Sequence, residues 1–141
     1  MRPSRTLAPD ATQGLVAVVT GGGTGIGAAT AHELARTGAR VAICGRRVEP
    51  IERTGAELVE AGADVLARSG VDVREPEQVS AFVDAVLERF GRIDVLVNNA
   101  GGQYFTPAEG IAMKGWRAVW RLNVGATLEM TRAAVDGAMR A

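Results

Sequence analysis

The chain has 141 residues, of which 47% are hydrophobic and 23% charged, and its 16 basic and 16 acidic side chains cancel. This length fits one domain with a real core, and the balanced charge argues against nucleic acid or an anionic membrane as a partner. The single cysteine, Cys44, excludes an internal disulfide and fits a reducing compartment. No apolar run approaches the roughly 18–20 residues that span a bilayer. Residues 1–14 lack the apolar core of a secretory signal, so we expect a flexible tail there and a cytoplasmic protein.

Residues 15–141 alternate between strand and helix patterns and are predicted to form one domain. Short apolar runs rich in β-branched residues predict strands, whereas apolar residues spaced three and four apart predict helices. Strands are predicted at 15–19, 41–44, 64–73 (interrupted at Ser69-Gly70) and 93–97, and helices between the first glycines and Gly38 and at 48–61, 75–90 and 115–139. This alternation is typical of an α/β fold, a Rossmann-type doubly wound parallel sheet with strand order 3-2-1-4. In that order the ligand crevice lies between the first and fourth strands.

A glycine cluster separates the first predicted strand from the first predicted helix, with the pattern Thr20-Gly21-x-x-x-Gly25-x-Gly27. Glycines let the backbone approach a ligand closely, and the N-terminus of the following helix suits a pyrophosphate. We therefore predict a dinucleotide site whose cofactor-binding residues here are Gly21, Gly23, Thr24, Gly25, Ile26 and Gly27. A flexible glycine-rich connector is the alternative, whereas a P-loop is excluded because no Lys-Ser/Thr pair follows the glycines.

The end of the second strand indicates which dinucleotide binds. Sites for NAD place an acid there, about 20 residues past the glycines, to hold the ribose 2′-hydroxyl. Here the sequence reads Cys44-Gly45-Arg46-Arg47, and an arginine at this place can pair with a 2′-phosphate. We predict NADP as the cofactor, with NAD less favoured, and Arg46 and Arg47 as cofactor-binding residues. Two solvated arginines on a turn are the alternative.

The pattern TGxxxGxG at residues 20–27 resembles the signature of the short-chain dehydrogenase/reductase family. Asn98-Asn99-Ala100-Gly101, which follows Ile93–Val97, matches the family's NNAG sequence, and Trp116-x-x-x-x-x-x-Asn123-Val124 matches the position of its catalytic asparagine. The resemblance implies that Asn99, Ala100 and Gly101 lie against the cofactor. It also implies that Asn123 holds a water molecule in a proton relay. An ordinary Asn-Gly turn and a surface asparagine are the alternatives.

The pair Asp72-Val73 stands at the predicted end of the third strand. The resemblance implies that this pair lies at the adenine of the cofactor, with the Asp72 side chain accepting a hydrogen bond from the adenine amino group. The alternative is an aspartate in a turn after a strand. No group of His, Cys or carboxylate residues has the spacing of metal ligands, so no metal site is predicted.

The family's remaining catalytic residues have no counterpart in this chain. The resemblance implies a serine and a Tyr-x-x-x-Lys pair beyond a fifth strand, whereas the only tyrosine here, Tyr104, has Ala108 four residues later. The only lysine is Lys114, which precedes Asn123. We therefore expect a fold truncated before the fifth strand, with the fourth strand as an exposed edge, and a chain that is inactive alone.

The segment Asn98–Trp116 is similar to trans-2-enoyl-CoA reductases and 2,4-dienoyl-CoA reductases, and also to some terpenoid alcohol dehydrogenases. The resemblance implies hydride transfer from NADPH to an acyl-CoA or related carbonyl substrate, as in fatty acid metabolism, by a protein that is a homo-oligomer in its full-length form. Trp116 and Trp120 are then expected to pack in a core or an interface. A non-catalytic dinucleotide-binding fragment, or an interaction module that needs a partner chain, remains the alternative function.

Overall fold

The computed structural model describes residues 7–139, and their centre is a four-stranded parallel sheet. The strands are β1 (Val16–Thr20), β2 (Arg40–Gly45), β3 (Val65–Ser69) and β4 (Val95–Val97). They lie in the order β3-β2-β1-β4, with Val18 of β1 between Ala42 of β2 and Leu96 of β4. The predicted fold class and strand order are therefore confirmed.

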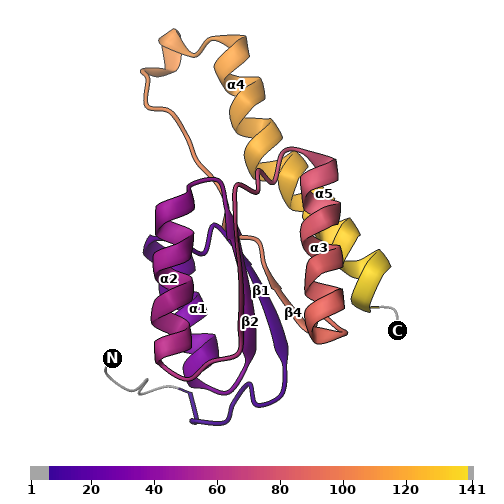
Figure 1. The fold of residues 1–141 in the computed structure, drawn as a ribbon. Coiled ribbons are helices and arrows are strands. Elements are labelled where there is room, and N and C mark those ends of the chain that lie inside the picture. Colours follow the sequence, from indigo (N-terminus) through magenta and orange to yellow (C-terminus); the bar gives the residue numbers. More distant parts are fainter. Residues whose placement is uncertain (1–6, 140–141) are drawn as a thin grey trace.

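Helices cover both faces of this sheet (Figure 1). The helical elements in chain order are α1 (Gly25–Arg36), α2 (Val48–Glu60), α3 (Pro76–Phe90), the short turn η1 (Ala108–Gly110), α4 (Met113–Trp120), η2 (Arg121–Gly125), α5 (Ala126–Ala134) and η3 (Val135–Met139). Helices α1 and α2 lie on one face, and α3 and α5 lie on the other (Figure 1). This arrangement follows from the right-handed crossovers that connect parallel strands.

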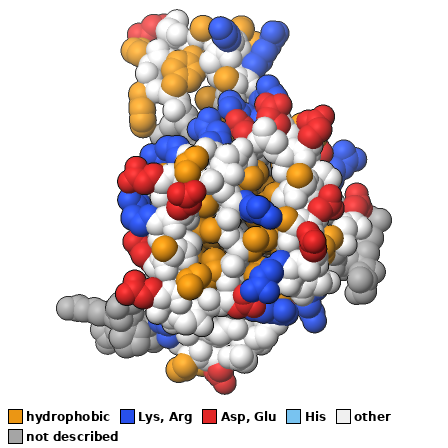
Figure 2. Space-filling view, in the orientation of Figure 1, with side chains coloured by type: hydrophobic (Ala, Val, Ile, Leu, Met, Phe, Trp, Pro, Cys, Tyr) orange, Lys and Arg blue, Asp and Glu red, His pale blue; other side chains and the backbone are white. Residues whose placement is uncertain are grey.

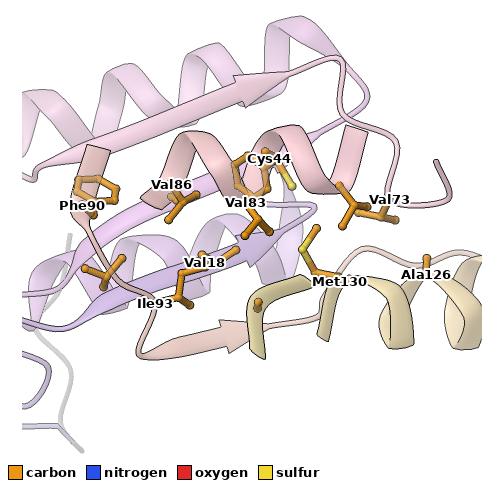
Figure 3. Close-up of a cluster of buried hydrophobic side chains, with 14 residues drawn as sticks. Val18, Cys44, Val73, Val83, Val86, Phe90, Ile93, Ala126 and Met130 are labelled. Atoms are coloured by element: carbon orange, nitrogen blue, oxygen red, sulfur yellow. The ribbon is translucent and has the colours of Figure 1, made fainter. Parts of the chain in front are cut away.

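The core has two halves because successive residues of a strand point to opposite faces of the sheet. From β1, Ala17 and Val19 pack toward α1 and α2, where Ile51 and Leu58 are buried. The even-numbered residues Val16 and Val18 pack in the second half with the buried residues of α3 and α5, namely Val79, Phe82, Val83, Val86, Phe90, Ala126, Met130 and Ala134 (Figure 3). The buried residues of α3 recur three and four positions apart, as expected for the predicted helix, whereas Val59 of α2 is apolar and yet 60% exposed.

Most elements differ from their predicted bounds by one or two residues at an end, and two elements differ more. The third strand ends at Ser69, because Gly70 takes a left-handed conformation with φ of +75°, so Asp72 and Val73 lie in the loop between β3 and α3. The predicted helix at 115–139 is present from residue 113 onward, but residues 121–125 form a wider, π-helical turn. The side chain of Asn123 in this turn donates to the backbone oxygen of Val119 at 2.9 Å.

The expected flexible tail at 1–14 is partly ordered. The hydroxyl of Thr12 donates to the backbone oxygen of Leu34 at 3.0 Å. The backbone N–H of Gly14 donates to the backbone oxygen of Gly38 at 3.2 Å. For residues 8–14 the expectation was therefore wrong, because hydrogen bonds to the end of α1 hold these turns in place. Residues 1–6 lie outside the described residues.

The segment after β4, together with α4, extends away from the sheet (Figure 1). All of α4 is described, and none of its residues is buried. Trp116 and Trp120 stack on each other with ring centroids 6.3 Å apart and stay 52% and 57% exposed, so neither belongs to the core of this chain. Hydrophobic side chains on this segment lie at the surface, at the top of Figure 2. Within residues 7–139, every helix is too short or too polar to span a bilayer.

Candidate functional site

A pocket of about 230 Å³ opens where the carboxyl ends of the four strands meet. Most of its lining follows a strand directly, and α2 and η2 supply the remainder. The lining residues are Gly21, Gly23 and Thr24 after β1; Gly45, Arg46 and Arg47 at the end of β2; Val71 and Val73 after β3; Asn99, Ala100 and Gly101 after β4; Pro50 and Ile51 of α2; and Leu122 of η2. This is the place where open α/β sheets bind their ligands.

The glycines after β1 make a turn that side chains would not permit. Gly21 has φ of +66°, and a Cβ there would lie 2.9 Å from the Asn99 side-chain nitrogen. A Cβ at Gly23 would lie 2.9 Å from the backbone of Pro50, and one at Gly27 would lie 2.3 Å from the oxygen of Gly21. The turn therefore packs tightly against β4 and α2 and leaves the N-terminus of α1 beside the pocket.

Thr20 and Asn99 join the ends of β1 and β4. The buried Thr20 hydroxyl accepts hydrogen bonds from the backbone N–H groups of Asn99 at 3.1 Å and Ala100 at 2.9 Å. In return, the Asn99 side chain donates to the backbone oxygens of Thr20 at 2.9 Å and Gly21 at 3.2 Å. Asn99 thus fixes the glycine turn, and the backbone beyond it lines the pocket.

Two arginines stand at the rim of the pocket. Arg46 and Arg47 follow β2, and both are exposed. The Arg47 side chain donates to the hydroxyl of Thr24, which follows β1, at 3.4 Å. Arg46 lies close enough to Asp72 to contribute to the lowered pKa of that carboxyl. The rim therefore carries positive charge that is suited to a phosphate group.

Asp72 and Arg74 form a close ion pair beside the pocket. The Arg74 Nε lies 2.9 and 3.1 Å from the two carboxylate oxygens of Asp72, and the backbone N–H of Arg74 donates to the same carboxylate at 3.0 Å. Hydrogen bonds from the Arg74 guanidinium lower the pKa of Asp72 from 3.8 to about 2, although burial opposes this shift. Asp72 is therefore ionised at neutral pH and committed to a partner within the chain.

Asn123 lies in the π-helical turn η2 and holds the loop after β4. Its side-chain amide donates to the backbone oxygen of Gly102 at 2.7 Å, and its carbonyl accepts from the N–H of Gly102 at 3.2 Å. This reciprocal pair fixes the loop next to Gly101, which lines the pocket. Turns of this kind are frequent at functional sites.

The pocket brings together most of the residues predicted from the sequence. Nine of them line it, namely Gly21, Gly23, Thr24, Arg46, Arg47, Val73, Asn99, Ala100 and Gly101. Five do not, namely Gly25, Ile26, Gly27, Asp72 and Asn123; the first three form the start of α1, where the side chain of Ile26 is 79% exposed.

Sequence reasoning missed several contributors to the site. The hydroxyl of Thr20 could have been noticed from its place in the glycine pattern. Gly45, Pro50, Ile51, Val71 and Leu122 carry no local signal, because tertiary packing alone brings them to the pocket.

Two residues of chemically reactive types, a cysteine and a histidine, do not line the pocket. Cys44 is fully buried in β2, and burial raises the pKa of its thiol to about 12. His32 lies on α1 within 3.2 Å of the Glu57 carboxylate of α2. Among residues 7–139, no group of three or more His, Cys, Asp or Glu side chains could hold a metal ion.

Comparison with known proteins agrees with this architecture. A family model described as short chain dehydrogenase matches residues 15–141. A peroxisomal 2,4-dienoyl-CoA reductase of Arabidopsis thaliana is 35% identical over 127 residues, which are 90% of this chain and 42% of that protein.

Two solved structures are similar as well. A citronellol catabolism dehydrogenase of Pseudomonas aeruginosa PAO1 superposes with a TM-score of 0.87 at 40% identity, covering 95% of this chain and 54% of that one. A short chain dehydrogenase from Burkholderia cenocepacia J2315 in complex with NADP gives a TM-score of 0.83 at 35% identity, covering 90% of this chain and 52% of that one. The chain thus spans about half the length of the relatives that it matches. Because the family model takes in every strand and helix described above, the chain belongs to the short-chain dehydrogenase family.

Proposed function

We propose that this chain builds the NADP-binding part of an oxidoreductase that transfers hydride between NADP(H) and an enoyl-CoA or carbonyl substrate. The observation that carries the proposal is the glycine-lined pocket at the carboxyl ends of the strands, with Arg46 and Arg47 at its rim. Two comparisons support it: the A. thaliana relative is named for a dienoyl-CoA substrate, and the B. cenocepacia structure is a complex with NADP.

The residues of the pocket fit a phosphate-rich dinucleotide. Gly21 and Gly23 leave the turn without side chains, and the start of α1, which carries no acid in its first turn, presents backbone N–H groups with a positive dipole end. Arg46 and Arg47 supply charge for a 2′-phosphate. When bound, NADPH would supply the hydride.

The cofactor preference is tested by charge reversal at Arg46. Loss of charge-assisted hydrogen bonds to a 2′-phosphate weakens binding by about tenfold or more, so we expect Arg46→Asp to raise the Kd for NADPH by that factor. NADH has no 2′-phosphate, so its Kd should change by less than about twofold. Arg53→Asp is the matched control, because Arg53 lies on the neighbouring helix outside the pocket. Equal weakening of both cofactors by Arg46→Asp would contradict the assignment.

The second candidate is a non-catalytic dinucleotide-binding fragment or interaction module that needs a partner chain. The sequence favours this candidate because Tyr104, its only tyrosine, is followed at the fourth residue by Ala108 and not by lysine. Asn123 is then the one residue of the proposed proton relay on this chain. An assay of NADPH oxidation with an enoyl-CoA separates the candidates: cofactor binding without turnover supports the second one, and turnover by this chain alone excludes it.

Two further assignments concern the oligomeric state and the location. A homo-oligomer is expected of the full-length form, and sedimentation of that form would measure its state. A cytoplasmic location also stays a prediction, since the A. thaliana relative is named a peroxisomal enzyme.

A further inference from the structure

One polar side chain interrupts the buried face of α2. The buried residues of this helix recur at helical spacing and are Ile51, Thr54, Gly55 and Leu58. Thr54 is only 2% exposed, and a buried hydroxyl needs a hydrogen-bond partner. Its hydroxyl donates to the backbone oxygen of Gly23, 31 positions earlier in the chain, at 3.2 Å. One directed bond therefore joins α2 to the glycine turn after β1.

The bond of Thr54 differs from the one that a helical threonine usually makes. Threonine hydroxyls in helices commonly donate to the carbonyl three or four residues earlier in their own helix. In this chain Thr127 and Thr131 do so, donating to the backbone oxygens of Asn123 at 3.0 Å and of Thr127 at 2.7 Å. Thr54 instead donates outside its helix, to a residue that lines the pocket. Its hydroxyl thus contributes to the tertiary structure of the site.

Close packing holds α2 in the position that this bond requires. A Cβ at Gly23 would lie 2.9 Å from the backbone of Pro50 in the first turn of α2. A Cβ at Gly55 would lie 2.7 Å from the Cβ of Ala67 in β3. The backbone of α2 therefore approaches both the glycine turn and the sheet more closely than larger residues would allow, and the Thr54 hydroxyl stays within reach of the Gly23 carbonyl.

The direction of the Gly23 carbonyl decides what the next peptide group offers to the pocket. The peptide between Gly23 and Thr24 is trans, as are all the described peptides, so its N–H points opposite to its C=O. Because the carbonyl accepts from Thr54, the N–H of Thr24 points away from that hydroxyl. Both residues of this peptide line the pocket, and the Thr24 hydroxyl accepts from Arg47 at 3.4 Å. The peptide thus lies between Thr54 and the charged rim.

We propose that Thr54 is a positioning residue of the dinucleotide site and that it favours NADPH over NADH. Thr54 does not line the pocket and acts through the Gly23 carbonyl. This contact holds Thr24 beside Arg47, where the backbone N–H of Thr24 and the guanidinium of Arg47 donate to a 2′-phosphate. The inference rests on the proposed NADP-binding function.

The binding test compares two buried threonines. Valine has the shape of threonine without the hydroxyl, so Thr54→Val should raise the Kd for NADPH about fivefold, which corresponds to a fall of the competent turn to about a fifth of the population. The Kd for NADH, which lacks the 2′-phosphate, should change by less than about twofold. Thr54→Ser keeps the hydroxyl and should bind NADPH as the wild type does. Thr37→Val is the matched control, because Thr37 is fully buried and donates to backbone oxygens at the far end of α1, outside the pocket lining.

Three results of this binding test would overturn the proposal. The first is a Thr54→Val protein in which the Kd values for NADPH and NADH rise equally, or in which neither rises. The second is a loss of NADPH affinity in Thr54→Ser as large as the loss in Thr54→Val. The third is an equal loss in Thr37→Val, which would show that any buried threonine hydroxyl has the same effect.

A second measurement needs no cofactor. NMR order parameters for the N–H groups of Gly23 and Thr24 report the motion of the turn in the free protein. The wild type and Thr54→Ser should give about 0.85, as in a rigid backbone, and Thr54→Val should fall below about 0.6. Unchanged order parameters in Thr54→Val would overturn the positioning role. A wild type that binds neither dinucleotide would refute the proposed function, while the order parameters still decide whether Thr54 holds the turn.

Discussion

The tightest contact of the glycine turn makes Gly27→Ala a sharp perturbation. A Cβ at Gly27 would lie 2.3 Å from the backbone oxygen of Gly21 and 2.4 Å from the side-chain nitrogen of Asn99. To restore an ordinary contact of about 3.4 Å, α1 or the turn must shift by about 1 Å. Overpacking of this kind costs about 1–3 kcal/mol, and the hydrogen bonds of Asn99 to Thr20 and Gly21 add about 1 kcal/mol each when they are strained.

Helix propensity partly offsets this destabilisation, because alanine is favoured over glycine by about 1 kcal/mol in a helix. We therefore expect Gly27→Ala to lower the free energy of unfolding by about 2–4 kcal/mol and the Tm by roughly 5–15 °C. Urea denaturation followed by circular dichroism measures the first quantity, and thermal denaturation measures the second. NADPH affinity should fall as well, because the shift displaces Gly21 from the pocket wall.

Gly125→Ala is the matched control. Gly125 is helical, with φ of −59°, and a Cβ there would meet no described atom within 4 Å beyond its chain neighbours and the backbone of its own helix. The free energy of unfolding of this variant should rise by up to about 1 kcal/mol. If Gly27→Ala proves as stable as Gly125→Ala, the packing argument for the glycine turn is wrong.

Three further predictions concern buried and charged groups. Thr20→Val removes the acceptor of two backbone N–H groups, so the free energy of unfolding should fall by about 2 kcal/mol. Urea titration measures this change, and an unchanged free energy of unfolding would show that the two N–H groups find other partners. Because the pKa of the Cys44 thiol is about 12, a thiol reagent at pH 8 should label Cys44 only as the protein unfolds; rapid labelling of the native protein would refute its burial. The folded-state pKa of Asp72, about 2, lies below its usual value of 3.8, so the carboxylate stabilises the fold above about pH 4 and this stabilisation is lost as the pH falls toward 2. Asp72→Asn should remove about 1 kcal/mol at pH 7 and flatten this pH dependence; parallel pH curves for the two proteins would contradict the ion pair.

The order of elements could be predicted because each one carries a local pattern. The apolar stripe of α3 repeats at helical spacing, and the β-branched run of β1 is short and bounded by glycine, so both were recognised without tertiary information. The short ending of β3 was missed because the apolar residues Val71 and Val73 continue the strand pattern after Gly70. Their burial comes from the pocket and the core, and not from a partner strand.

Some parts of the candidate site could be predicted from the sequence, and others depend on the tertiary structure. The sequence by itself determined the glycine turn and the backbone after β4, because close approach of the main chain requires small residues at fixed places. It also determined that arginines, and no acid, follow β2. Only the tertiary structure decided which side chains are free to meet a ligand. Asp72 is engaged by Arg74, Asn99 by the glycine turn, and Leu122 reaches the pocket from a helix about fifty residues beyond Asp72. Hydrogen-bond partners and pocket walls depend on distances between segments, and the spacing of residues along one chain does not contain these distances.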